Sequence, residues 1–139
     1  MIEVHVVPKE YASEVWIQAE PFIAKAIARV ANRVDSFAIW KCVADGVYQL
    51  WIVTNGQTII AAFVTNIQDH PLIRAINMPY LGGEDNSIHL WYGLALQKVE
   101  EFARLNGCKI AEFTGRPGWK KLMESSGYSP IMTTFEKAL

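Results

Sequence analysis

The sequence has little excess charge of either sign. Its 139 residues include 13 lysines and arginines against 14 aspartates and glutamates, for a net charge of -1. Proteins that bind nucleic acids or anionic membranes usually carry clustered Lys and Arg, so we expect neither partner. Disordered chains are poor in apolar residues, whereas 51% of this sequence is hydrophobic. The composition therefore indicates a folded protein with one substantial core.

Cysteine is scarce as well, and its pattern excludes some kinds of site. Cys42 and Cys108 lie far apart, with no CxxC or Cys/His ligand pattern around either. We therefore expect two reduced thiols and no metal site. The N-terminus has no apolar signal segment, and no apolar run reaches the ~18 residues of a membrane span. With a length typical of one domain, the sequence predicts a single domain over residues 1–139 and a cytoplasmic location.

The first third of the sequence predicts one strand followed by helices. Residues 2–7 are rich in β-branched side chains and read as a strand that Pro8 ends. Apolar residues at helical spacing follow, but Pro21 lies among them. Because proline disrupts a helix interior, we expect two helices that separate near Glu20, the second ending near Asn32.

A third helix and a β-hairpin come next. Asp35 or Ser36 is a suitable N-cap, and Gly46 a suitable C-terminal glycine. The expected apolar positions of this helix are Phe37, Trp40 and Val43. The strand at 47–54 is followed by Asn55-Gly56, which is the strongest short hairpin signal between two apolar runs, and by the strand at 58–67.

The second half predicts strands around one long helix. Residues 73–80 read as a strand, perturbed near Pro79, and LGGEDNS reads as a loop. Asp85, Asn86 or Ser87 then caps a helix that ends at Gly107. Its expected inner face is Ile88, Trp91, Ala95, Val99 and Phe102. A buried strand at 108–114, a short helix closed by Gly127, and one or two final strands in YSPIMTTFEKAL complete the order.

This order, together with two local stretches, resembles the GCN5-related N-acetyltransferase (GNAT) superfamily. LALQKVEEFARLNGCKIAEF is similar to the long central helix and following strand of that family, and KKLMESSGY is similar to its late segment. GRPGW followed by GY also resembles small acetyltransferase-like proteins of bacteriophages. The resemblance implies an α/β fold of the acyl-CoA N-acyltransferase type, with a mixed, mostly antiparallel sheet and helices on both faces.

The resemblance also implies a function and a site. Members transfer an acetyl group from acetyl-coenzyme A to an amine, here a small molecule or a peptide. The family holds the pantetheine where the fourth and fifth strands separate, and the pyrophosphate on glycine-loop amides and the helix N-terminus. The cofactor-binding residues that this implies are Met78, Tyr80, Gly82, Gly83, Ser87, Arg116, Trp119 and Lys120. A homodimer is one alternative for the oligomeric state.

Three features depart from the family pattern. Leu90 and Tyr92 occupy the region where the family has its loop glycines, and Met123 stands where many members have a proton-donating tyrosine. Glu112 is the candidate catalytic base, because a carboxylate within an apolar strand invites a perturbed pKa. Its alternatives are a structural ion pair with Arg116 or Lys109, or a position facing water at the end of the sheet. The second interpretation of the chain is accordingly a non-catalytic protein of the same fold with an interaction or assembly role.

Overall fold

A computed structural model describes all residues 1–139 and shows one five-stranded sheet in the order β1-β2-β3-β4-β5. Neighbouring strands are antiparallel from β1 to β4, whereas β5 runs parallel to β4 after the long crossover helix. This arrangement confirms the predicted mixed, mostly antiparallel sheet. The strands are β1 (Ile2–Val6), β2 (Gln49–Asn55), β3 (Thr58–Asp69), β4 (Arg74–Gly83) and β5 (Ile110–Phe113).

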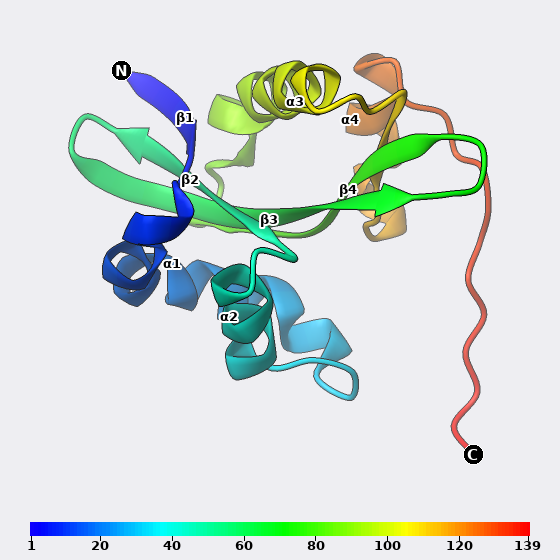
Figure 1. Cartoon of the computed structure of the whole chain (residues 1–139), viewed down its shortest axis with the longest axis horizontal. Coiled ribbons are helices and arrows are strands. Elements are labelled where there is room, and N and C mark those ends of the chain that lie inside the picture. The colour runs from blue at the N-terminus through cyan, green and yellow to red at the C-terminus, as the bar shows by residue number, and fades with distance from the viewer.

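Helices cover both faces of the sheet, as Figure 1 shows, with α1 and α2 on one face and α3 and α4 on the other. None of them has the length and apolar character that crossing a bilayer would require. The first face carries η1 (Lys9–Tyr11), α1 (Ala12–Ile27), η2 (Ala28–Val30) and α2 (Ser36–Ala44). The second carries α3 (Ile88–Leu105), η3 (Pro117–Trp119) and α4 (Lys120–Ser125).

The capping and turn residues identified in the sequence adopt the local structures that were predicted for them. The Asp35 carboxylate accepts a hydrogen bond of 2.8 Å from the Ala38 amide at the start of α2. Gly56 turns the chain between β2 and β3 with a φ of 64°, and Gly107 ends α3 with a φ of 77°. Both glycines adopt the left-handed backbone that other residues rarely tolerate.

Two hydrophobic cores lie on the two faces of the sheet. The core under α3 is built on nearly parallel rings: Trp51 and Phe63 have centroids 5.6 Å apart, and Phe63 and Trp91 lie 6.4 Å apart. The core under α1 and α2 includes Ile23 and Ile39. In α2, Phe37 is 69% exposed, so its predicted core position was wrong, and Ile39 takes that role.

The expected break in the first helix does not occur. Pro21 lies inside the continuous helix α1, and it leaves the carbonyl of Ile17 without an amide partner. Both residues are exposed, so water can solvate that carbonyl. On the opposite face, Ala19 and Ile23 are completely buried against the sheet. Packing therefore outweighs the local preference of proline.

The fourth strand is longer than predicted and contains a β-bulge. Val64 pairs with Tyr80 and Asn66 with Asn77, so Met78 and Pro79 together face one residue of β3. Past the bulge, β4 continues to Gly83. The glycine pair that was expected in a loop is therefore part of the strand.

The predicted final strands are absent. No residue after Ser125 belongs to a helix or strand, and Figure 1 shows the C-terminal tail running away from the sheet. Ile131, Met132 and Phe135 are each more than 70% exposed. Pro130, near the start of the tail, cannot donate a ladder hydrogen bond. As a consequence β5 is an edge strand, half-buried instead of fully buried.

Candidate functional site

A cavity of about 820 Å³ lies where β4 and β5 separate. The parallel pairing ends at Met78 and Phe113, and the last backbone hydrogen bond runs from the Thr114 amide to the Met78 carbonyl at 3.3 Å. At the same point the Thr114 hydroxyl lies 3.4 Å from the side-chain oxygen of Asn77. The bulge and the short β5 together leave the two strands apart beyond this point.

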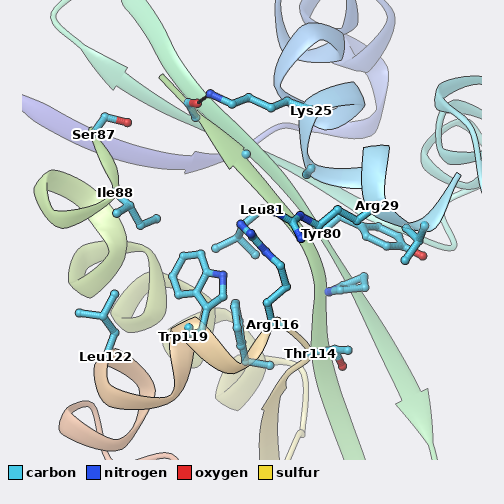
Figure 2. Close-up of a pocket in the computed structure, with 18 of the residues that line it drawn as sticks. Lys25, Arg29, Tyr80, Leu81, Ser87, Ile88, Thr114, Arg116, Trp119 and Leu122 are labelled. Carbon is cyan, nitrogen blue, oxygen red and sulfur yellow. Dashed lines mark hydrogen bonds between the residues drawn. The ribbon is translucent and has the colours of Figure 1, made fainter. Parts of the chain in front are cut away.

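Residues from both faces of the sheet line this cavity, as Figure 2 shows. Ile88, Leu122 and Trp119 contribute an apolar wall from α3, α4 and η3. Lys25 and Arg29 approach from α1 and η2 on the opposite face. The cavity therefore spans the sheet, with an apolar side and a basic side.

The exposed edge of β4 supplies polar groups to the cavity. Residues 79–83 have β3 on one side but no β5 partner on the other. Backbone N–H and C=O groups on that edge are therefore free to bind a ligand, as at other open sheet edges. One is already used, because the Gly83 carbonyl accepts a hydrogen bond of 3.0 Å from Lys25.

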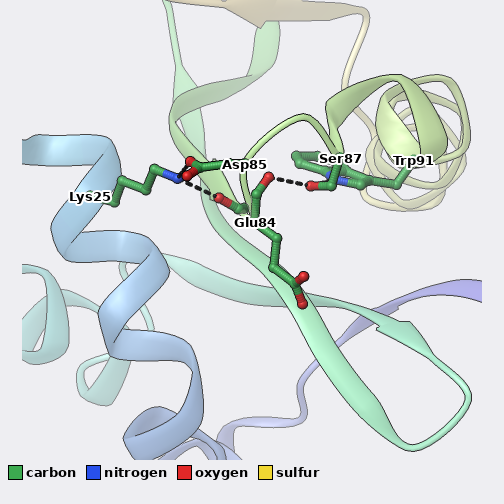
Figure 3. Close-up of polar contacts among 6 residues, drawn as sticks. Lys25, Glu84, Asp85, Ser87 and Trp91 are labelled. Carbon is green, nitrogen blue, oxygen red and sulfur yellow. Dashed lines mark hydrogen bonds and ion pairs between the residues drawn. The ribbon is translucent and has the colours of Figure 1, made fainter.

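The turn between β4 and α3 is held by two sets of contacts, shown in Figure 3. Lys25 forms an ion pair with Asp85, and this hydrogen bond and positive charge lower the pKa of the Asp85 carboxyl. The Ser87 hydroxyl donates to the Glu84 carbonyl at 2.7 Å and accepts from the Trp91 indole at 3.2 Å. The turn carries two carboxylates, Glu84 and Asp85, that would repel an anion, and Lys25 of α1 neutralises the second of them.

The N-terminus of α3 has unsatisfied amides. Ser87 occupies the cap position, but its side chain makes no capping hydrogen bond because it is directed to Glu84 and Trp91. The amides of Ile88 and His89 have no partner within the chain. Free amides at a helix N-terminus attract anions, and this helix starts at the cavity wall.

Six of the eight predicted cofactor residues line the cavity: Tyr80, Gly82, Gly83, Ser87, Arg116 and Trp119. The other two do not. Met78 is completely buried in the core under α3, and Lys120 is exposed outside the lining. Met78 packs in the core with residues of α3, whereas Lys120 is exposed at the start of α4.

Gly82 has a different role from the one its sequence suggested. A Cβ atom at this position would lie 2.0 Å from the Phe22 carbonyl oxygen of α1. The residue is a glycine because a helix backbone packs directly on the strand. Its presence in the cavity wall follows from that packing.

The candidate base Glu112 lies outside the cavity lining. Its carboxylate is 3.9 Å from the His70 imidazole. The alternative had proposed an ion pair with Arg116 or Lys109, and neither residue is the partner. Its catalytic role stays a prediction. Tyr128 is also outside the cavity: its hydroxyl donates to Glu100 at 2.8 Å, and burial together with this acceptor raises its pKa.

Sequence reasoning missed the basic side of the cavity. Nothing near them in the sequence marks Lys25, Arg29 and Arg33 as binding residues, and their spacing of four residues was the only available signal. Asn77 and Thr114 were missed because their importance depends on where the strands separate. No group of three His, Cys, Asp or Glu side chains could hold a metal ion.

Comparisons with known structures place this architecture in one fold. A GCN5-related N-acetyltransferase from Ralstonia eutropha JMP134 superposes with a TM-score of 0.69 at 18% identity, over 99% of both chains. The glucosamine-6-phosphate N-acetyltransferase from Arabidopsis thaliana gives 0.69 at 9% identity, over 99% of this chain and 98% of that one. An aminoglycoside acetyltransferase from an uncultured soil metagenomic sample gives 0.73 at 9%, covering 99% and 96%.

The sequence itself matches no family model and no curated protein. At these identities the structural likeness establishes the fold, and the chain therefore has the GNAT fold that its element order suggested.

Proposed function

We propose that the protein is an N-acetyltransferase that takes its acetyl group from acetyl-coenzyme A. The observation that carries the proposal is the cavity at the separation of β4 and β5, which opens to both faces of the sheet in a fold shared with acetyltransferases. Two reactants can meet in such a cavity from opposite sides. Acetyl-coenzyme A supplies an activated thioester, whose carbon–sulfur bond breaks as the acceptor nitrogen bonds to the acetyl carbon and loses a proton. The released thiolate takes up a proton, so coenzyme A leaves as the free thiol.

The residues present fit the cofactor. The unpaired edge of β4 at 79–83 offers hydrogen-bonding groups to the amides of a pantetheine chain, as a strand edge does to a peptide. The free amides of Ile88 and His89, with Arg116 across the cavity, suit phosphate groups. Lys25 favours the same arrangement because it neutralises Asp85 at the entrance.

The side chains of the cavity are better suited to positioning than to proton transfer. No histidine lines it, and Met123, at the position of the family's tyrosine, is buried in the core. Apart from the Lys25–Asp85 ion pair, Tyr80 and Glu84 are the lining groups that could exchange a proton. Ile88 and Trp119 form an apolar wall, and alignment of a free amine with a thioester provides a large share of the rate.

Calorimetric titration of the protein with acetyl-coenzyme A and with coenzyme A tests this function. We expect both to bind, and Arg116→Ala to weaken binding about tenfold, the usual scale for a hydrogen bond to a charged group. Arg104→Ala is the matched control, because Arg104 lies on the exposed face of α3 outside the cavity. Absence of binding at millimolar ligand would refute the proposal.

A non-catalytic interaction role is the second candidate, and the C-terminal tail favours it. The tail exposes Ile131, Met132 and Phe135, while the outer edge of β5 has no partner. Exposed apolar segments and open edges are typical interaction surfaces, including those of homodimers. The titration separates the candidates, because this role does not require cofactor binding. Either role fits the cytoplasm, since both thiols are free.

A further inference from the structure

Three cations form a row on the α1 side of the cavity. Lys25 of α1, Arg29 of η2 and Arg33 of the turn after η2 follow one another at intervals of four residues, and all three line the cavity. The row concentrates positive charge on one side of the cavity, which favours anions there.

Two members of the row already hold carboxylates. Lys25 pairs with Asp85 of the β4–α3 turn. Arg33 donates from Nε, at 3.1 Å, and from Nη2 to one oxygen of Glu136 in the C-terminal tail. Arg29, between them, has no carboxylate partner, and Figure 2 shows its side chain extending toward Tyr80 and the part of the cavity that Arg116 also approaches.

The position of the row in the fold indicates which of the two reactants, the cofactor or the acceptor amine, it contacts. Figure 1 shows α1 on the face of the sheet opposite α3. The free amides that suit cofactor phosphates are at the N-terminus of α3. Arg29 and Arg33, farther along the row than Lys25, therefore lie on the side from which the second reactant would enter.

We propose that the acceptor is an amine bearing a carboxylate, which Arg33 and Arg29 bind on the α1 side, and that Glu136 occupies this carboxylate site in the isolated chain. The inference rests on the proposed function, since it names the substrate class of the same cavity. A guanidinium is well suited to this task because its planar donors match a carboxylate. An uncharged amine would leave Arg29 with solvent as its only partner.

The exposure of the C-terminal tail indicates that another carboxylate can replace Glu136 at Arg33. Residues around Glu136 make little contact with the body of the protein, and Phe135 is 90% exposed. The Arg33–Glu136 pair is itself half-exposed on both sides. Exposed ion pairs are weak, so a free carboxylate can displace Glu136.

Binding without cofactor provides the first test. Glycine, β-alanine and γ-aminobutyrate, each compared with its primary amide, are titrated by NMR into the wild-type protein and into Glu136→Gln. At least one of the acids should bind the Glu136→Gln variant more tightly than the corresponding amide binds it. The same acid should also bind this variant more tightly than it binds the wild-type protein. Adding Arg33→Ala should weaken that binding about tenfold, whereas adding Arg104→Ala should not. Equal affinities for acids and amides, or no binding of any acid, would overturn the inference.

Acetyl transfer provides the second test and separates the two proposals. With acetyl-coenzyme A saturating, Arg33→Ala should raise KM for the acids while leaving cofactor affinity unchanged. Preference for the amides would overturn the acceptor assignment and leave the acetyltransferase function intact. Failure to bind acetyl-coenzyme A would refute the function, while the carboxylate site would still be decided by the titrations without cofactor.

Discussion

Replacing Gly82 by alanine tests how the cavity is built. The new Cβ would lie 2.0 Å from the Phe22 carbonyl oxygen, 2.9 Å from its carbonyl carbon and 3.3 Å from Ala26 Cβ. Ordinary contact between such atoms needs about 3.5 Å, so α1 and β4 must move apart by roughly 1.5 Å. The obstacle is helix backbone, and no change of side-chain rotamer can relieve it.

The expected cost is a large loss of stability. Overpacking a core usually costs about 1–3 kcal/mol, and we expect about 3 kcal/mol for Gly82→Ala because rigid backbone must shift. In urea, with a slope of about 2 kcal/mol per molar, the midpoint should fall by roughly 1.5 M. The displacement of α1 also carries Lys25 and Arg29 away from the cavity, so ligand binding should weaken in the fraction that folds.

Gly93→Ala is the matched control. Gly93 is exposed in the middle of α3, and a Cβ there would meet nothing within 4 Å. Alanine exceeds glycine in helix propensity by about 1 kcal/mol, so this variant should be more stable than wild type. If Gly82→Ala unfolds at the wild-type urea concentration and loses only cofactor affinity, Gly82 is a ligand-binding glycine and the packing argument is refuted.

Two further predictions concern ionisation and thiol reactivity. The lowered pKa of Asp85 means that its pair with Lys25 stabilises the fold above the unfolded pKa of about 3.9 and loses this contribution as pH falls through the folded value. Asp85→Asn should therefore flatten the acid side of a stability-versus-pH curve, and an unchanged slope would contradict the pair. Burial also raises the pKa of the Cys108 thiol, so a disulfide reagent at neutral pH should label Cys42 first; the reverse order in single-cysteine variants would show that Cys108 is accessible.

The features that sequence predicted correctly depend on neighbouring residues. The Asp35 cap, the hairpin at Gly56 and the end of α3 at Gly107 each involve contacts within a few positions. The inner face of α3 was largely correct for the same reason, since helical spacing alone brings Trp91, Ala95 and Val99 onto one side. The element order then sufficed for the fold, because a strand, a long helix and another strand favour a parallel crossover.

The incorrect predictions concern positions where distant packing changes a local preference. Pro21 remains helical because buried alanine and isoleucine side chains hold α1 against the sheet. Gly82 resembles a loop glycine, but its conformation is that of a strand and its small size serves a helix far along the chain. The tail has a strand-like composition, yet no strand pairs with it.

The basic row of the cavity shows why the site was harder to predict than the fold. Its partners are remote: Asp85 lies 60 positions from Lys25, and Glu136 lies 103 positions from Arg33. A regular spacing of charged residues along a helix usually marks its solvent-exposed face. It points to ligand binding here only because folding brings the row to the gap between β4 and β5, where the middle cation, Arg29, has no carboxylate of its own. Arg29, exposed and unpaired between two paired cations, is therefore available to an anion, and this arrangement arises from the tertiary structure.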